Sequence, residues 1–278
     1  MADLNYGWVG KILKVDLTKM KVSIISTYQY VPKLIGGRGV GAMLYWEEVP
    51  PECKAFDPEN ALIFMTGPAT GTLAPAAGRF YVACKSPVNI KETYCPSVPG
   101  GHWGPELKFA GYDGIVVKGK AAKPVYLWIN NGEVEIRSAN YIWGNTVSNT
   151  MLQIYKQHGP KARILCIGPA GENLCREAAI IIDSEHATGI SGAGAVMGSK
   201  NLKAIVVLGT GAVKVAKPQE LMDLWWHYSR LITRKPGEAE YPHMHKSLFD
   251  GLYHRTHIPH CPGHPEGPGE RRPGRRKS

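Results

Sequence analysis

Short apolar segments bounded by glycine, proline and asparagine dominate most of this chain, and they restrict it to a fold built from short strands. With 32 glycines and 21 prolines among 278 residues, turns interrupt the pattern too often for long helices. Besides a hairpin over 7–30, we expect strands at 61–65, 78–85, 114–119, 125–129, 134–137, 163–167, 178–182 and 204–208. The apolar run at 61–65 predicts a buried strand, and the mixed pattern at 78–85 predicts a half-buried one.

Three segments have helical periodicity. One follows Gly36-Gly-Arg-Gly39 over 40–46, and a second covers 146–158 with an apolar face formed by Val147, Met151, Ile154 and Tyr155. The third, 218–232, has proline in its first turn and an apolar stripe made by Leu221, Leu224, Trp225, Tyr228 and Leu231.

Together these patterns predict an α+β fold. A β-rich domain of about ten strands with one or two helices is expected over 1–212, followed by the start of a helical domain over 213–250. The segment 251–278 has almost nothing to bury, and we expect a disordered basic tail. Its abrupt change to histidine, proline, glycine and arginine also resembles translation in a wrong reading frame.

Charge and cysteine content narrow the function classes. The net charge is +10, and part of the surplus lies in the tail, so a polyanionic cofactor or an acidic partner fits better than nucleic acid. The sequence has neither an apolar run long enough for a membrane span nor a Sec-type signal, which favours a cytoplasmic location. The six cysteines have no Cys-x-x-Cys spacing, which argues against a metal site, and we expect the first five to be buried thiols.

Three glycine-punctuated blocks, at 100–113, 167–173 and 192–205, place small residues and backbone amides beside charged or amide side chains. Such blocks let a backbone approach a large anionic cofactor closely. The alternative is that the glycines only form turns.

The polar residues of these blocks have structural alternatives as well. We expect Glu106, Lys108 and Asp113 to hold the domain together. Glu172 and Asn173 either cap the next segment or face the cofactor.

The blocks resemble the N-terminal domain of the aldehyde ferredoxin oxidoreductase family over about residues 6–208. Further matching motifs are Gly36-Gly-Arg-Gly39, Thr66-Gly-Pro68, Gly78-Arg79 and Lys85-Ser-Pro87. The resemblance implies two packed β-sheets that form a saddle-like base for a tungsten- or molybdenum-bis-pyranopterin. It also implies oxidation of an aldehyde or related oxo compound, with electrons passing through a [4Fe-4S] cluster to ferredoxin.

The same resemblance implies a set of site residues. Arg79 would contact a pterin, because a planar guanidinium matches phosphate and heterocycle edges. The main-chain carbonyls of Val98 and Ala187 would bind Mg²⁺ between the pterin phosphates. The other expected cofactor-binding residues are Gly100, Gly101, His186 and Gly189. No catalytic residue is assigned.

The chain departs from the family pattern in three places. Val98-Pro99 stands where Asn-Ser is common, and the loop 186–190 reads His-Ala-Thr-Gly-Ile where the family often has Arg-Ala-x-Gly-Arg. The family's cluster-binding Cys-x2-Cys-x3-Cys group is missing, and only Cys261 lies in that region. The resemblance therefore implies no iron–sulfur ligands in this chain.

Three hypotheses follow. The first is an incomplete oxidoreductase chain, inactive alone, whose partners would be a missing C-terminal half or a second copy. The second is a pseudoenzyme or partner subunit that keeps the fold without the cofactor. The third, in which the basic tail binds nucleic acid, would require steeply salt-dependent binding.

Overall fold

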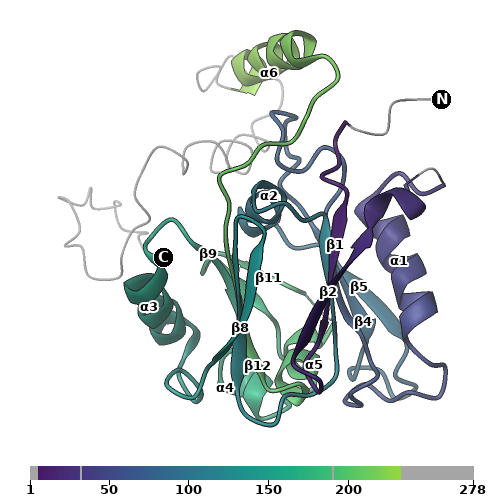
Figure 1. Cartoon of the computed structure of the whole chain (residues 1–278), viewed down its shortest axis with the longest axis vertical. Helices are drawn as coiled ribbons and strands as arrows, with labels where there is room; N and C mark the ends of the chain where they lie inside the picture. Colours follow the sequence, from purple (N-terminus) through teal and green to yellow (C-terminus); the bar gives the residue numbers. More distant parts are fainter. Residues whose placement is uncertain (1–5, 32, 190, 233–278) are drawn as a thin grey trace, which may run out of the picture.

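The computed structural model describes residues 6–31, 33–189 and 191–232. Within them, two six-stranded mixed sheets pack face to face with helices on their outer sides (Figure 1). The predicted α+β class and the prediction of two packed sheets are confirmed.

The first sheet has the strand order β2-β1-β6-β3-β4-β5. Its strands, in chain order, are β1 (Lys11–Asp16), β2 (Lys21–Ser26), β3 (Leu62–Met65), β4 (Tyr81–Lys85), β5 (Tyr94–Ser97) and β6 (Gly114–Lys118). Strands β1 and β6 are parallel, and every other pair in this sheet is antiparallel. The sheet therefore ends in β2 on one side and β5 on the other.

The second sheet has the order β11-β10-β9-β12-β7-β8. Its strands are β7 (Val125–Asn130), β8 (Glu133–Ser138), β9 (Arg163–Cys166), β10 (Ile181–Ile182), β11 (His186–Ala187) and β12 (Leu202–Leu208). Only β12 and β7 are parallel. The strand expected at 178–182 is shorter than predicted, because pairing with β9 covers only its last two residues.

The helices are more numerous than the sequence indicated. They are η1 (Thr27–Gln29), α1 (Gly37–Glu48), α2 (Trp103–Phe109), α3 (Val147–His158), α4 (Pro169–Glu172), α5 (Ala193–Ser199) and α6 (Pro218–Ile232). The expectation of one or two helices within the β-rich domain was wrong. Helices α2, α4 and α5 are short, and each is either largely buried or rich in glycine. They therefore lack the amphipathic pattern of α1 and α3.

The two sheets repeat one topology. Each half begins with a hairpin and a helix, continues with three antiparallel strands, and ends with a short helix and a strand that inserts beside the hairpin. The second half has one additional helix, α4, between β9 and β10. The orders β2-β1-β6-β3-β4-β5 and β8-β7-β12-β9-β10-β11 correspond strand by strand. The last strands even share the letters Ile-Val-Val, at 115–117 in β6 and 205–207 in β12.

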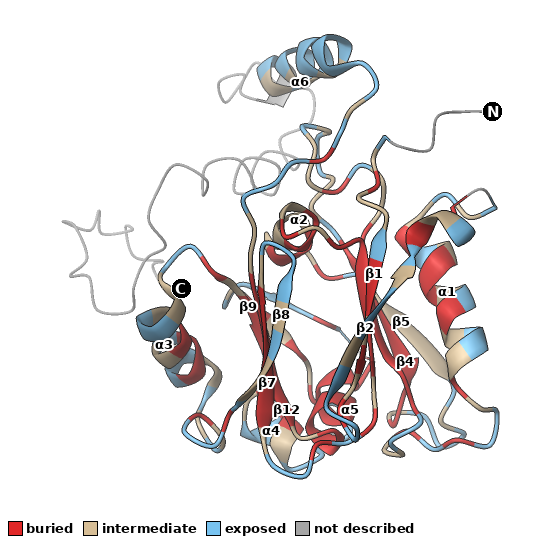
Figure 2. Ribbon diagram, in the orientation of Figure 1, coloured by how far each residue is buried: buried red, intermediate tan, exposed pale blue. Residues whose placement is uncertain are grey.

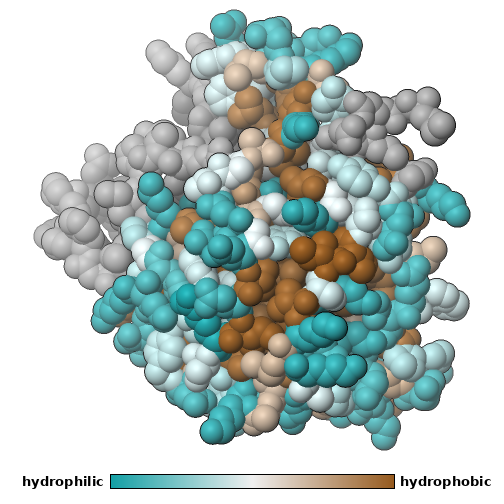
Figure 3. All heavy atoms as spheres, in the orientation of Figure 1, coloured by the Kyte–Doolittle hydropathy of each residue, from teal (hydrophilic) through white to brown (hydrophobic). Residues whose placement is uncertain are grey.

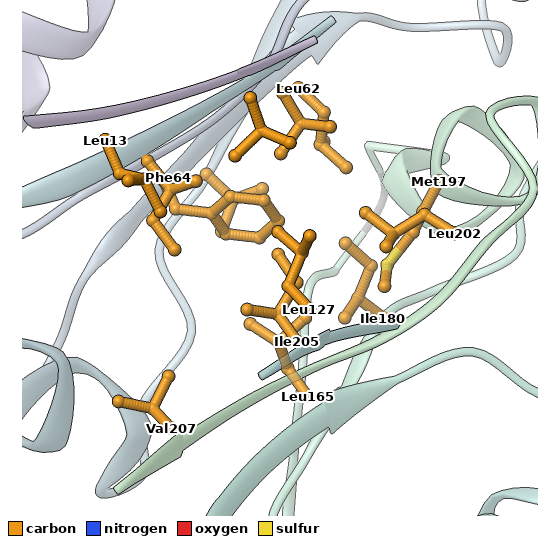
Figure 4. Packing of buried hydrophobic residues seen from close by; sticks show 14 of the residues in the cluster. Leu13, Leu62, Phe64, Leu127, Leu165, Ile180, Met197, Leu202, Ile205 and Val207 are labelled. Carbon is orange, nitrogen blue, oxygen red and sulfur yellow. The ribbon is translucent and has the colours of Figure 1, made fainter. Parts of the chain in front are cut away.

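The main core lies between the sheets. Side chains from both sheets point toward one another there, among them Phe64, Leu127, Leu165 and Ile205 (Figure 4). Helix α1 covers the outer face of the first sheet and α3 that of the second, each with its buried side inward (Figure 2). Burial of this kind contributes about 25 cal/mol per Å² of apolar area.

Strand β4 corrects the prediction of a half-buried strand at 78–85. All five of its residues are buried, because one face packs under α1 and the other faces the second sheet. Arg79 does not belong to the strand, which begins at Tyr81.

Helix α6 confirms the helix predicted at 218–232, and it lies apart from both sheets (Figure 1). Three large side chains of α6, those of Leu224, Trp226 and Tyr228, are 47–52% exposed. The rest of the segments predicted as a helical domain and a basic tail, 233–278, lies outside the described residues. Among the described helices, none has the length and apolar character needed to cross a membrane.

Apolar side chains also reach the surface between the edge strands β2 and β8 (Figure 3). Val22, Val134 and Ile136 are only partly buried against the main core, and Ile24 is 52% exposed. The sandwich is thus open at this pair of edges.

Candidate functional site

The loop after β5 meets β11, which brings predicted site residues from both halves together. A Cβ atom at Gly100 would lie 3.1 Å from Nδ1 of His186, and one at Gly101 would lie 3.0 Å from its Cδ2. Gly101 also has a φ of +92°, a conformation that side-chain-bearing residues rarely adopt. The contact with His186 therefore favours glycine at both positions.

Arg79 joins this cluster from the segment before β4. Its Nη1 donates a hydrogen bond to the main-chain carbonyl of Val98 over 2.9 Å. Both residues are exposed, and a Cβ atom at the neighbouring Gly78 would lie 3.3 Å from the carbonyl oxygen of Gly101. Arg79 and the 98–101 loop thus form one surface of the site.

The end of β11 and the residues just after it, which follow His186, hold the remaining predicted site residues. Thr188 is buried and bonds Ile180 twice: its N–H donates to the Ile180 carbonyl over 3.0 Å, and its Oγ1 accepts from the Ile180 N–H over 2.9 Å. This anchor leaves the flanking Ala187 and Gly189 exposed, and no atom lies within 4 Å of a Cβ position on Gly189. Ile190 lies outside the described residues.

Val98 and Ala187 stand at corresponding places in the two halves. Val98 directly follows β5, and Ala187 ends β11, which is the matching strand of the second sheet. The repeated topology therefore presents two main-chain carbonyls from equivalent strand ends. Carbonyl oxygens of this kind are suitable ligands for Mg²⁺.

Asp183 lies beside the predicted site residues and was not expected from the sequence. It lies in the turn between β10 and β11, where Asp183 and Ser184 have φ values of 48° and 62°. Its Oδ1 accepts a hydrogen bond from the Ile164 N–H over 3.0 Å, and its Oδ2 would lie 3.8 Å from a Cβ atom on Gly101. Its turn has no marker in the sequence, because glycine or asparagine usually occupies such φ values.

Electrostatics around Asp183 tie the two halves together. Burial raises the pKa of Asp183, while the charge of Arg163 and hydrogen bonds from the N–H groups of Ile164 and His102 oppose that rise. Because His102 precedes α2 of the first half, the carboxylate connects the 98–101 loop to the β10–β11 turn.

Comparison with known proteins identifies the family. The family model described as "Aldehyde ferredoxin oxidoreductase, N-terminal domain" matches residues 12–209. This chain belongs to that family. The family resemblance expected from the glycine blocks is thereby confirmed.

Individual relatives agree with the family match. The chain is 47% identical over 219 residues to a tungsten-containing aldehyde ferredoxin oxidoreductase of Pyrococcus furiosus, covering 78% of this chain and 36% of that protein. It is 37% identical to a P. furiosus protein named aliphatic sulfonate oxidoreductase, WOR-like subunit, covering 78% of this chain and 37% of that protein. The chain thus spans little more than a third of the length of these relatives.

A solved structure shows the same fold. It is the active site complex BamBC of benzoyl coenzyme A reductase in complex with 1,5-dienoyl-CoA. The match has a TM-score of 0.78 and 41% sequence identity, and it covers 82% of this chain and 35% of that one.

Other residues of the glycine blocks in this family member have structural roles. Lys108 and Asp113 form an ion pair of 2.9 Å with both side chains fully buried, and Asp113 also accepts from the Val9 and Gly10 N–H groups and the Thr27 hydroxyl. Glu106 accepts a hydrogen bond from the Gly209 N–H over 2.9 Å. The expectation that Glu106, Lys108 and Asp113 hold the domain together is confirmed.

The second half also has a buried ion pair, formed by a lysine at the position that Asp113 holds in the first half. Lys203 lies two residues before the Ile-Val-Val of β12, as Asp113 does before that of β6, and its buried ammonium pairs with Glu172. Glu172 also accepts from the Gly144 N–H over 2.9 Å, so it acts as a structural anchor.

Helix α5 lies in the third glycine block, 192–205, and its glycines have a role that differs from the predicted one. Cβ atoms at Gly194 and Gly198 would lie 2.5 Å from the Ala179 carbonyl oxygen and 2.0 Å from that of Gly171. The close approach at these positions is between segments of the fold itself. The interpretation as cofactor contacts was wrong here, because α5 is buried throughout.

The structure also shows how far the cysteines are buried and whether possible metal ligands cluster. Cys53, Cys84 and Cys166 are buried as expected, whereas Cys95 is half-buried and Cys175 is exposed. Cys261 lies outside the described residues. Over the described ranges, no cluster of three or more histidine, cysteine, aspartate or glutamate side chains could hold a metal ion.

Proposed function

We propose that residues 1–212 form the pterin-binding base of a tungsten- or molybdenum-dependent oxidoreductase. The observation that carries the proposal is the contact of His186, next to Ala187 on β11, with Gly100 and Gly101, beside the Arg79–Val98 hydrogen bond. Carbonyl oxygens would suit an Mg²⁺ ion that accompanies a bis-pterin, and a cationic surface would suit its phosphates. The donor set of this chain fits that group.

In this proposal each residue has a defined task. Arg79 would bind a phosphate or pterin edge with its planar fork, and Val98 and Ala187 would hold the Mg²⁺ through carbonyl oxygens. His186 supplies a ring N–H toward phosphate, and Gly100, Gly101 and Gly189 keep the backbone accessible. When bound, the metal-pterin supplies the redox chemistry of aldehyde or oxo-group oxidation, and the protein orients it.

The rest of the oxidoreductase would complete the electron path. Helix α6 would open the helical domain proposed for residues 213–250, and the [4Fe-4S] ligands that pass electrons to ferredoxin would come from outside the described residues. This is consistent with the names of relatives, in which ferredoxin oxidoreductase recurs.

The test is cofactor content. The full chain is produced in a host that makes tungsten- and molybdenum-pterins, and metal and pterin are quantified per polypeptide. Bound metal with about twice its amount of pterin supports the proposal, and Arg79→Ala should lower both at least several-fold. Arg137→Ala, a substitution of an arginine on β8 at the other edge of the second sheet, is the matched control and should retain both.

A second candidate is a non-catalytic partner subunit that keeps the fold without cofactor. The observation that favours it is the loop at His186–Gly189, where histidine stands in place of a common family arginine. A purified, folded chain without tungsten, molybdenum or pterin would support this candidate and contradict the first.

A further inference from the structure

Cys84 and Cys95 are directly opposite each other on the neighbouring antiparallel strands β4 and β5. The Ser86 N–H donates to the Thr93 carbonyl over 2.9 Å, which makes that pair a hydrogen-bonded one. Because hydrogen-bonded pairs alternate along an antiparallel ladder, the Cys84–Cys95 pair is also of this type, with a Cα separation of about 5.5 Å. Disulfides bridge Cα atoms about 4.4–6.8 Å apart.

The two thiols differ in access. Directly opposed residues project from the same face of the sheet, and for Cys84 this face is the core between the sheets. Cys84 is fully buried, and burial raises the pKa of its thiol to about 12. Cys95 is half-buried, because β5 is the edge strand of the first sheet. An oxidant from solvent therefore reaches Cys95 first.

We propose that Cys84 and Cys95 form a reversible disulfide when the chain meets a peroxide. The sulfur of Cys95 attacks the peroxide O–O bond and becomes a sulfenic acid, and the peroxide is reduced to water or an alcohol. The sulfur of Cys84 then attacks the sulfenic sulfur, the S–S bond forms, and a second water leaves. Two thiols are oxidised and one peroxide is reduced.

Strand β5 is suited to this step. Cβ atoms of opposed residues lie about 4.5–5.5 Å apart, and a disulfide needs about 3.5–4.5 Å, so one strand must move inward. Strand β5 is paired on one side only and contains Pro96, which has no N–H to donate. A disulfide formed with such strain is readily reduced again.

The Cys84–Cys95 disulfide would form next to the candidate site. Strand β5 continues directly into Val98, whose carbonyl accepts the Arg79 hydrogen bond. The disulfide would fix the strand that carries this carbonyl. The chemistry itself does not depend on the proposed function, since it involves only the two thiols and the oxidant.

The experiment treats the full chain with a small excess of hydrogen peroxide, followed by alkylation under denaturing conditions and peptide mapping. The free thiols should fall from six to four, with one linked peptide pair joining Cys84 to Cys95. Dithiothreitol should restore all six. Cys95→Ser should abolish the link, and Cys175→Ser, which removes an exposed thiol elsewhere, should leave it unchanged.

A second variant separates chemistry from folding. In Cys84→Ala, Cys95 should persist as a sulfenic acid that dimedone traps, whereas the parent chain gives little adduct. The proposal is overturned if the parent chain accumulates the dimedone adduct without a link, or if the linked peptides contain any other cysteine.

Discussion

The guanidinium of Arg79 donates to the carbonyl of Val98 over 2.9 Å, so two residues expected to bind different parts of one cofactor also bind each other. The carbonyl that would bind Mg²⁺ already has a cation beside it. A carbonyl oxygen has two lone pairs, so the contact with Arg79 is compatible with a second partner. It also ties the 98–101 loop to the segment before β4.

This contact should be measurable without the cofactor. Because both residues are exposed, the hydrogen bond contributes about 0.7 kcal/mol or less. Arg79→Ala should therefore speed amide hydrogen exchange in residues 98–101 by roughly three-fold. Exchange in β8 should not change. Equal exchange rates in the loop of parent and variant would show that the contact does not order it.

The Gly101–His186 contact predicts a sharp difference between two glycines of the site. Gly101→Ala places a Cβ atom 3.0 Å from His186 at a φ of +92°, so we expect a loss of about 1–3 kcal/mol in the free energy of unfolding. Gly189→Ala meets no neighbour within 4 Å and should cost less than about 0.5 kcal/mol. Urea denaturation measures both, and equal losses would contradict the site geometry.

The buried Lys108–Asp113 ion pair predicts a larger loss in the free energy of unfolding. Asp113→Asn leaves the fully buried Lys108 ammonium without a counter-charge, and removing one partner of such a pair costs about 3–5 kcal/mol. Glu135→Gln removes the partner of Arg137 in an exposed pair on β8 and should leave the free energy of unfolding nearly unchanged. Chemical denaturation distinguishes the two, and a small loss in Asp113→Asn would show that Lys108 finds another partner or loses its proton.

Sequence patterns predicted the helices and turns that have a regular spacing of apolar residues or a strong local signal. The amphipathic helix at 146–158 was found because Met151 and Ile154 repeat with helical spacing, and the hairpin turn at Asn131 has a strong local signal. Helix α5 was missed because burial on all sides leaves no polar face to set a period. The duplicated topology was missed because it is a property of strand pairing, and only Ile-Val-Val repeats visibly.

The sequence predicted only part of the candidate site. The resemblance pointed to Arg79, Val98 and His186, which the fold does bring to one region. It missed Asp183, because a single aspartate in a turn without glycine gives no signal until β9 and α2 are placed around it.

Buried Lys200 predicts a pH dependence of stability. Its Nζ donates to the carbonyls of Pro58 over 3.2 Å and Gly119 over 3.3 Å, and burial lowers its pKa from 10.5 to about 8. Below pH 8 the lysine is charged in both the folded and the unfolded chain, so folding carries the full cost of burying the charge. Between pH 8 and 10.5 the unfolded chain holds more protons, and the free energy of unfolding should rise with pH. From the shift, this rise is about 3 kcal/mol.

Other groups titrate in the same range, so the comparison must be with a variant that lacks only this ammonium. Lys200→Met keeps an unbranched apolar side chain of similar length, and its stability should not show the component of the rise that belongs to Lys200. The difference between parent and variant should therefore change by about 3 kcal/mol between pH 7 and 10.5 in favour of the parent. Parallel curves would show that Lys200 keeps its proton, which would mean that the two carbonyls offset its burial fully.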